Sequence, residues 1–217
     1  MATRTNEMLT GVILGYDPGG NGAHGVAKLT VRSGQPSSLV TSTLQTVEEV
    51  INYMADMSNI AAIGVDTLTC WCTGLSAWRP ADRWLRDRYG KVRSSIVSPN
   101  GLRGSMVLNG MTVLMQARLK FPGLPITETH PKILYWHLSN QKYGYTSSKV
   151  AMNKTLSHAL GIDVSPTTEH EWDAALSTLA ALRGVTRCWM LDLHGLPTGI
   201  DEQIISPCGR TNYFWPE

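Results

Sequence analysis

The sequence lacks a long hydrophobic run, because no uninterrupted apolar stretch approaches the roughly 20 residues that a membrane-spanning helix needs. The segment 1–7 is polar and contains no apolar core, so the pattern of a secretory signal is missing as well. Internal repeats, low-complexity tracts and linker-like segments are also absent from the sequence. These absences predict a soluble, cytoplasmic protein with no membrane partner.

Cysteine is scarce, with four residues in a chain of 217. Cys70 and Cys72 are separated by one residue, whereas zinc-binding knuckles usually place roughly two to four residues between paired ligands. Cys188 and Cys208 are each isolated in the sequence. The spacing therefore favours free thiols in a reducing compartment over a metal site.

The proportion of charged residues is low, at 17%, and hydrophobic residues make up 42% of the chain. This balance excludes a disordered chain and is typical of a globular α/β protein. A chain of 217 residues is long enough to bury a sizeable core, and we expect residues 1–217 to form one domain. Its core should cover about 11–184, with 185–217 as a C-terminal extension.

The net charge of +2 conceals a basic segment at residues 79–103, in which Asp82 and Asp87 are the acidic residues. Trp78, Trp84 and Tyr89 alternate with the basic side chains, as on surfaces that bind polyanions. An amphipathic helix with solvated arginines explains the segment equally well. The candidate nucleic-acid-binding residues are Arg79, Arg83, Arg86, Arg88, Lys91, Arg93 and Arg103.

Apolar runs and turn residues in the first half of the chain predict an antiparallel meander that leads into a parallel strand. Strands are expected at 11–17, 23–32 and 38–44, with turns at Pro18-Gly19-Gly20 and Ser33-Gly34-Gln35-Pro36. Thr46 and Glu49 are spaced as a capping box, so a helix should run from there to about Met57. The continuous apolar run 60–66 is typical of a buried parallel strand.

The second half of the chain is predicted to be mainly helical. We expect helices at 80–89 and 104–119, separated by a loop at 98–101, and a short strand at 125–128. Further helices should follow Pro131, which suits a first helical turn, and cover 147–160 and 169–183. In the segment 186–217, Tyr213, Phe214 and Trp215 are expected to anchor an extended tail.

Acidic residues end several of the predicted strands. Asp17 follows the apolar run Val12-Ile13-Leu14, Asp66 ends the predicted parallel strand, and Glu128 ends the strand at 125–128. Because ligands gather beyond the carboxyl ends of parallel strands, we expect these acids at one edge of the sheet. A buried carboxylate needs a cation or hydrogen bonds, so Asp17 in particular requires a partner.

The helix predicted at 169–183 carries two more candidate site residues. Thr168 and Glu171 form a capping box at its start, and His170 and Asp173 share one face near the positive end of the helix dipole. Ser177, Ala180 and Gly184 continue this face with small residues, which allow close packing on the sheet.

Together these acids predict a site for two divalent metal ions. Several neighbouring carboxylates do not all stay ionised without cations, and oxygen ligands favour Mg²⁺ or Mn²⁺ over zinc. A pair of such ions about 4 Å apart supports in-line phosphoryl displacement. His170 would orient or deprotonate the nucleophilic water, or act as a further ligand. Each acid taken alone is equally explained as a turn or helix cap.

The same residues resemble a known family. Gly15-Tyr16-Asp17-Pro18-Gly19 with Gly25-Val26-Ala27 resembles the first-strand motif of the ribonuclease H-like superfamily, particularly RuvC-type Holliday-junction resolvases. Asp66 matches their second catalytic carboxylate, and His170-x-x-Asp173-Ala174 matches their helix motif.

The chain is still more similar to the family of predicted ribonuclease H-like nucleases, over about residues 11–184. That likeness adds an Arg-rich helix at Arg79-Pro80-Ala81-Asp82-Arg83 and the Glu-x-x-Pro motif Glu128-Thr129-His130-Pro131. It implies a ribonuclease H-like α/β fold, with a central mixed five-stranded sheet flanked by helices, and two-metal hydrolysis of phosphodiester bonds. RuvC-type enzymes favour Glu where this chain has Asp66, and Glu128 lacks a firm counterpart in their pattern.

The sequence therefore predicts a nuclease that acts on DNA or RNA with two Mg²⁺ or Mn²⁺ ions. Asp17, Asp66, Asp173 and Glu128 are the expected metal ligands, with His170 as a further catalytic residue. A homodimer and selectivity for branched substrates are left open. Two alternatives remain: a non-catalytic scaffold of the same fold that binds nucleic acid or protein, and an actin-like ATPase or kinase lobe. The lobe is less favoured because a second glycine-rich phosphate loop is missing.

Overall fold

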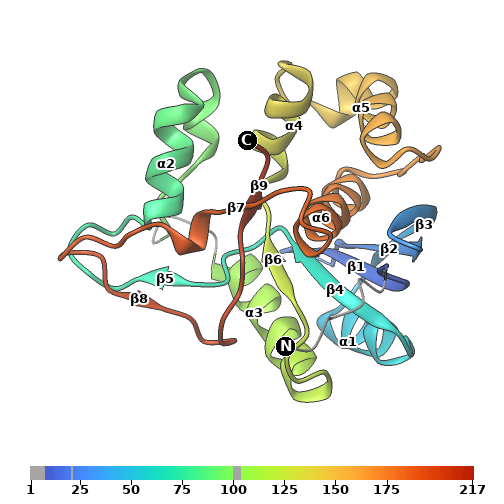
Figure 1. Cartoon of the computed structure of the whole chain (residues 1–217), viewed down its shortest axis with the longest axis horizontal. Coiled ribbons are helices and arrows are strands. Elements are labelled where there is room, and N and C mark those ends of the chain that lie inside the picture. The colour runs from blue at the N-terminus through green and yellow to red at the C-terminus, as the bar shows by residue number, and fades with distance from the viewer. Residues whose placement is uncertain (1–7, 21, 100–103) are drawn as a thin grey trace, which may run out of the picture.

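The computed structural model describes residues 8–20, 22–99 and 104–217, which form a mixed sheet covered by helices on both faces (Figure 1). The sheet has five strands in the order β3-β2-β1-β4-β6. Strands β1, β2 and β3 form the antiparallel meander, and β4 and β6 lie parallel to β1. Their bounds are β1 Gly11–Asp17, β2 His24–Arg32, β3 Gln35–Leu44, β4 Ile60–Val65 and β6 Ile126–Glu128. This is the strand arrangement that the resemblance predicted.

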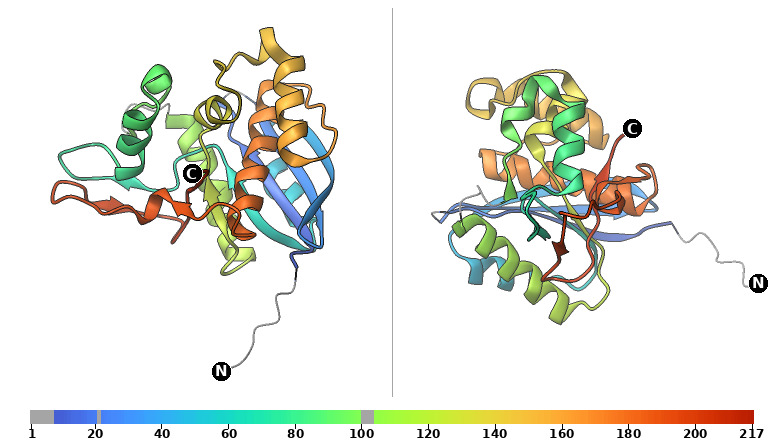
Figure 2. Two further views of the ribbon diagram at one scale, coloured as in Figure 1. Left: turned by 45° about the horizontal axis from the view of Figure 1, so that its top comes forward. Right: turned by 90° about the vertical axis from the view of Figure 1, so that its left-hand side faces the viewer.

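The helices divide between the two faces of the sheet, as the edge-on view in Figure 2 shows. Helices α1 (Val47–Ala55) and α3 (Gly104–Lys120) pack with Leu14 and Tyr16 of β1 on one face. Ile13 of β1 faces the opposite core, because side chains alternate along a strand. The helices of that core are α2 Pro80–Arg88, α4 Pro131–Ser139, α5 Tyr145–Leu160 and α6 Glu169–Val185.

Glycines in three neighbouring strands allow α6 to lie directly on the sheet. A Cβ atom at Gly15 of β1 would lie 1.9 Å from the carbonyl oxygen of Ala174, and one at Gly64 of β4 would lie 1.9 Å from that of Ser177. At Gly25 of β2 the carbonyl oxygen of His170 would be 2.0 Å away. These contacts are too short for any side chain, so the path of α6 across β2, β1 and β4 depends on glycine at these positions.

The C-terminal segment returns to the sheet and packs into its core. Asn212 forms a parallel bridge with Thr127 and receives the backbone hydrogen bond of Glu128 at 2.8 Å, beside β6. The predicted anchor is confirmed for Tyr213 and Trp215, which are buried, and the indole Nε1 of Trp215 donates to the Tyr89 hydroxyl at 2.8 Å. The elements of this segment are β7 Leu191–Asp192, η3 Leu193–Gly195, β8 Ile204–Ile205 and β9 Phe214–Trp215.

Most predicted elements match the structure to within a few residues. The strand expected at 38–44 is longer, because Pro36 pairs with Val31 at a β-bulge and extends β3 back to Gln35. The strand β5 (Trp71–Cys72), which pairs with β8, was not predicted. In the loop expected at 98–101, Asn100 and Gly101 lie outside the described residues.

Within the described segments, the structure contains no helix that is both long and apolar enough to span a membrane.

Replacing Gly64 by alanine should destabilise the fold, because the added methyl group would collide with the backbone of α6. We expect a loss of about 1–3 kcal/mol in the free energy of unfolding, as for other overpacked cores. Chemical denaturation followed by circular dichroism measures this loss. Gly90→Ala is the matched control, because nothing lies within 4 Å of a Cβ there. Equal stability of Gly64→Ala and the wild type would contradict the packing described.

Candidate active site

Asp17 lies at the end of β1, beneath the first turn of α6. Its side chain is almost fully buried, at 2% exposure, and Oδ2 accepts a hydrogen bond from Nδ1 of His170 at 2.5 Å. Gly25 pairs with Asp17 across the β1–β2 ladder, which leaves room for His170 above it. The sequence prediction that Asp17 requires a polar partner is confirmed, and His170 is one.

Asp66 follows β4 and is held next to Asp17 by the sheet. Its backbone N–H donates to the carbonyl of Tyr16 at 2.9 Å, which continues the parallel β1–β4 ladder by one residue. The side chain lines a cavity of about 200 Å³ together with Glu128, His130 and Lys132. The expected gathering of strand-end acids at one sheet edge is therefore confirmed.

Asp173 reaches the same edge from the second turn of α6. Its side chain is 5% exposed, and Oδ1 accepts a hydrogen bond from the Tyr143 hydroxyl at 2.7 Å. Tyr143 lies between α4 and α5, outside the motifs that the sequence singled out. Because this bond comes from a neutral donor, it orients the carboxylate without neutralising its charge.

The start of α6 is fixed by its own capping residues. Thr168 is the N-cap, and its side chain accepts the backbone N–H of Glu171 at 3.1 Å, as the sequence predicts. Glu171 does not complete the capping box. Its carboxylate instead accepts the backbone N–H of Thr167 at 2.8 Å and the hydroxyl groups of Thr41 and Thr43 at 2.9 and 3.1 Å. These bonds tie the helix start to β3 and keep His170 and Asp173 over the sheet edge.

Burial and neighbouring negative charge raise the pKa of each of the three aspartates. Burial is the largest cause for each, and the charge of Asp17 raises the pKa of Asp66 and of Asp173 further. Lys132 partly offsets this for Asp17 and Asp66, and the hydrogen bond to Asp17 raises the pKa of His170. Among the described residues, His170 is the only basic side chain that forms a hydrogen bond with these aspartates. The cluster is therefore short of positive charge.

This deficit fits divalent metal ions. Asp17, Asp66 and Asp173 offer oxygen donors alone, which is the ligand chemistry of Mg²⁺ and Mn²⁺. Glu169 adds a fourth acid whose charge acts on all three.

Glu128 lies on the same sheet edge but is engaged elsewhere. Both of its carboxylate oxygens accept hydrogen bonds from the guanidinium group of Arg79, at 2.6 and 2.9 Å. This ion pair holds the pKa of Glu128 far below its usual range despite the burial of the group. The role of Glu128 as a ligand of the metal pair stays a prediction, and its ion pair gives it a charge partner that the aspartates lack.

The same ion pair contradicts the prediction that Arg79 binds nucleic acid. Arg79 is 2% exposed and also contacts Asp82 at 2.7 Å, so its guanidinium group is enclosed by two carboxylates. Arg103 lies outside the described residues. Arg86 is half-buried, with its guanidinium over the Trp78 ring, and Arg83 forms an ion pair with Glu202. Among the described residues of the segment, the exposed basic side chains that form no ion pair are Arg88, Lys91 and Arg93.

Three lysines, two of them missed by the sequence reasoning, line a polar cavity beside the aspartates. Lys91, Lys132 and Lys142 enclose a space of about 510 Å³ together with Tyr143 and Glu169. Lys132 lines the cavity of Asp66 as well, so the two cavities meet at this side chain. Lys132 stands one residue after Pro131, and neither its spacing nor its neighbours in the sequence distinguish it.

Replacing Asp66 by asparagine should stabilise the metal-free protein at neutral pH. A raised pKa means that the folded state binds protons more tightly than the unfolded chain. The stability from these groups is therefore full below about pH 4, the unfolded value for aspartate, and is lost as the pH rises through the folded pKa values. Removing one charge should raise Tm at pH 7 by about 2–4 °C, which corresponds to about 1 kcal/mol in a domain of this size.

Thermal melts in the presence of a chelator measure this change, and Mg²⁺ should stabilise the wild type more than the variant. Asp163→Asn, at an exposed position after α5, is the control. A lower Tm for Asp66→Asn than for the wild type across the neutral range would contradict the charge deficit.

Comparison with known proteins finds distant structural similarity and no sequence match. No protein-family model matches the chain, and neither does any curated protein sequence. Solved structures similar to this chain include Thermus thermophilus RuvC in complex with a Holliday junction substrate, at a TM-score of 0.46 and 14% identity. That match covers 78% of this chain and 92% of the other. Thermus thermophilus RuvC alone gives a TM-score of 0.45 and 14% identity, over 81% of this chain and 96% of the other.

Proposed function

We propose that this chain is a metal-dependent nuclease that hydrolyses phosphodiester bonds in DNA or RNA. The observation that carries the proposal is the convergence of Asp17, Asp66 and Asp173 at one sheet edge, with pKa values raised by burial and by neighbouring negative charge. Carboxylates are rarely assembled in this way for stability, since neighbouring negative charges repel one another. A cluster that lowers the stability of the fold and offers only oxygen ligands, which suit Mg²⁺ or Mn²⁺, is a candidate catalytic site.

The chain's own residues have separate tasks in this proposal. Asp17, Asp66 and Asp173 would hold the metal ions, with Asp17 as a ligand shared by both. Tyr143 orients Asp173 through its hydroxyl group. His170 holds Asp17 by its Nδ1–H bond and is partly exposed, so it can exchange protons with water near the reacting phosphate. Two Mg²⁺ or Mn²⁺ ions, when bound, would supply a nucleophile derived from water and stabilise the leaving oxygen.

Glu128 is not needed for this ligand set. Its two oxygens accept hydrogen bonds from Arg79, which supplies the charge partner that the aspartates lack. We therefore assign Glu128 to the support of the sheet edge beside Asp66.

The lysine cavity is the proposed path of the nucleic-acid backbone. Lys91, Lys132 and Lys142 bring positive charge next to the carboxylates, which would otherwise repel a phosphate. Half-buried tryptophan rings with basic side chains over them extend this surface over α2 and the following turn η1 (Gly90–Ser95). In these pairs Arg88 lies over Trp84 at 5.9 Å and Lys91 over Trp136 at 5.9 Å. In its more specific form, the proposal is that the nuclease selects branched DNA and binds it as a homodimer.

Replacing Asp17 or Asp173 by asparagine should abolish Mg²⁺-dependent cleavage while the fold persists. The amide keeps the size and hydrogen bonding of each side chain but removes the charge that binds the metal. We expect a loss of more than about 100-fold, because even the outer partners of metal ligands contribute about 10–100-fold. Cleavage of labelled four-way junctions, duplex DNA, single strands and RNA–DNA hybrids measures activity and ranks the substrates.

Asp163→Asn is the control for this series and should cleave like the wild type. Calorimetric titration with Mn²⁺ separates a nuclease from a scaffold that has lost its chemistry, because the scaffold should bind the metal weakly or not at all. Cleavage by Asp17→Asn at the rate of the wild type would falsify the assignment of the site.

Replacing Lys142 by alanine should weaken nucleic-acid binding equally for all sequences. The side chain is exposed and lines the cavity, so its loss removes about one phosphate contact. We expect the slope of log K against log salt to become shallower by about one. Fluorescence anisotropy at several salt concentrations, with Ca²⁺ in place of Mg²⁺, gives the slope. Lys154→Ala, exposed on α5 and outside this cavity, should leave it unchanged. An unaltered slope for Lys142→Ala would remove the cavity from the proposed path.

A further inference from the structure

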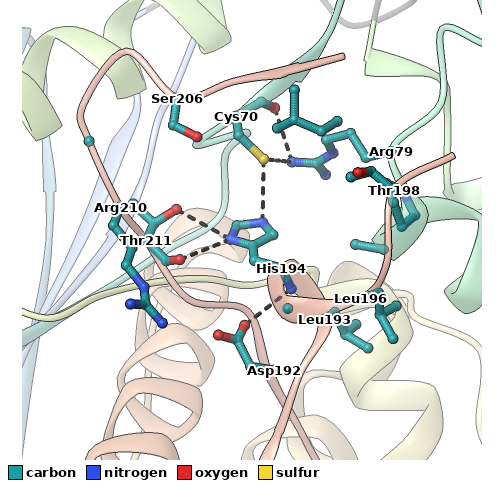
Figure 3. Close-up of a pocket in the computed structure, with 15 residues that line it drawn as sticks. Cys70, Arg79, Asp192, Leu193, His194, Leu196, Thr198, Ser206, Arg210 and Thr211 are labelled. Carbon is teal, nitrogen blue, oxygen red and sulfur yellow. Dashed lines mark hydrogen bonds between the residues drawn. The ribbon is translucent and has the colours of Figure 1, made fainter. Parts of the chain in front are cut away.

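A second cluster of side chains of metal-ligand types lies next to the aspartates, beneath the C-terminal segment. A cavity of about 390 Å³ is enclosed between this segment and the start of α2, and Figure 3 shows its lining. The side chains of Cys70, Arg79 and His194 converge on one another there. Glu128 approaches the same point from the end of β6, with Oε2 3.4 Å from Nε2 of His194.

The separations of the Cys70 and Glu128 donor atoms from the His194 ring nitrogen match a tetrahedral metal site. Sγ of Cys70 lies 3.6 Å from Nε2 of His194, and this nitrogen lies 3.4 Å from Oε2 of Glu128. All three atoms lie within 4.8 Å of one another. Zinc bonds of about 2.3 Å to sulfur and about 2.0–2.1 Å to nitrogen and oxygen, at tetrahedral angles, separate neighbouring ligand atoms by about 3.3–3.6 Å. The two measured separations fit this range.

The histidine ring is oriented as in a metal ligand. Its Nδ1 lies 3.3 Å from both the carbonyl oxygen and the hydroxyl oxygen of Thr211, and because the carbonyl can only accept, the tautomer that satisfies it has the proton on Nδ1 (Figure 3). Nε2 is then the nitrogen that points at Cys70 and Glu128. Metal-binding histidines usually donate their second ring N–H to a carbonyl or carboxylate in this manner.

We propose that Cys70, Glu128 and His194 bind one divalent cation of the zinc class, with the fourth coordination position open to the cavity. A thiolate, an imidazole and a carboxylate form a mixed donor set that favours Zn²⁺ over Mg²⁺. This site adjoins the aspartate site, because Glu128 and Asp66 line one cavity, but its ligand chemistry is different.

The charges around the cluster agree with a bound cation. Arg79 is buried with two carboxylates, those of Asp82 and Glu128, so these three groups carry one net negative charge. A Zn²⁺ ion bound to a thiolate adds one net positive charge and balances them. Arg79 donates to Cys70 Sγ at 3.6 Å and to Glu128, and the Thr69 backbone N–H donates to Glu128 at 2.8 Å. These donors would orient the ligands from outside the coordination sphere.

A network without metal is the competing explanation. In that case His194 itself supplies the positive charge: although burial opposes it, its contacts with Cys70 and Glu128 raise its pKa to about 10. An experiment distinguishes the two explanations by asking whether the protein binds a thiophilic cation through Cys70.

A bound ion would join three distant parts of the chain. Cys70 belongs to the loop between β4 and β5, Glu128 to the end of β6, and His194 to the C-terminal segment. Cross-links between segments that are far apart in sequence restrict the unfolded chain strongly. The ion would therefore fasten the C-terminal segment to the sheet edge that carries Asp66.

Cobalt titration tests the proposal on the full-length protein. After treatment with a chelator, addition of Co²⁺ should produce thiolate-to-metal charge-transfer absorption that saturates at one ion per chain. Zn²⁺, which has a filled d shell, should displace Co²⁺ and abolish the absorption. The zinc-loaded protein should melt at a higher temperature than the chelated protein.

Matched variants identify the ligands. Cys70→Ser should lose the charge-transfer absorption, whereas Cys188→Ser, at an exposed thiol outside the cluster, should keep it. Asp17→Asn should also keep it, so failure of the proposed nuclease site and failure of this site are distinguishable. If Cys70→Ser does not fold, X-ray absorption of the zinc-loaded wild type decides: one sulfur at about 2.3 Å supports the proposal. Absence of a thiolate band in the wild type, or its persistence in folded Cys70→Ser, would overturn it.

Discussion

The close contact between α6 and the sheet is the constraint on which the site depends. Gly25, Gly15 and Gly64 leave no side chain between the helix and strands β2, β1 and β4, so backbone meets backbone. This contact places His170 over Asp17 and brings Asp173 to the same sheet edge. The same packing buries the carboxylates and raises their pKa values, because it removes the water that would solvate their charge. The instability of the site and its suitability for divalent cations thus share one cause.

The neighbouring strands β4 and β6 serve two different chemistries at their carboxyl ends. The charge of Asp17 acts on Asp66, and these aspartates offer oxygen donors alone. Glu128 bonds to Arg79 and lies near the sulfur and nitrogen donors of Cys70 and His194. Oxygen ligands favour Mg²⁺, and a mixed set with a thiolate favours zinc. Two acids that follow equivalent strands are therefore distinguished by the side chains that face them.

Helices and strands were predicted well from the sequence where capping residues and apolar runs define them. The capping residue Thr168 fixes the start of α6, and the apolar run before Asp66 is the buried strand β4. Arg79 shows the limit of such patterns. It stands in a basic segment and was assigned to the surface, but a carboxylate from β6 encloses it with Asp82. Cys70 was likewise judged by its spacing to Cys72, whereas the groups it contacts come from distant segments.

The sequence by itself determined the strand and helix order, the strand-end acids and the pairing of His170 with Asp173 on one helix face. These features follow from periodicity and capping, which act over a few residues. Only the tertiary structure decided that Lys132 and Tyr143 stand beside the aspartates, that Glu128 pairs with Arg79, and that the C-terminal segment closes a second cluster. Such contacts join residues far apart in the chain, and their energies depend on burial and mutual charge, which exist only after the sheet and α6 have packed together.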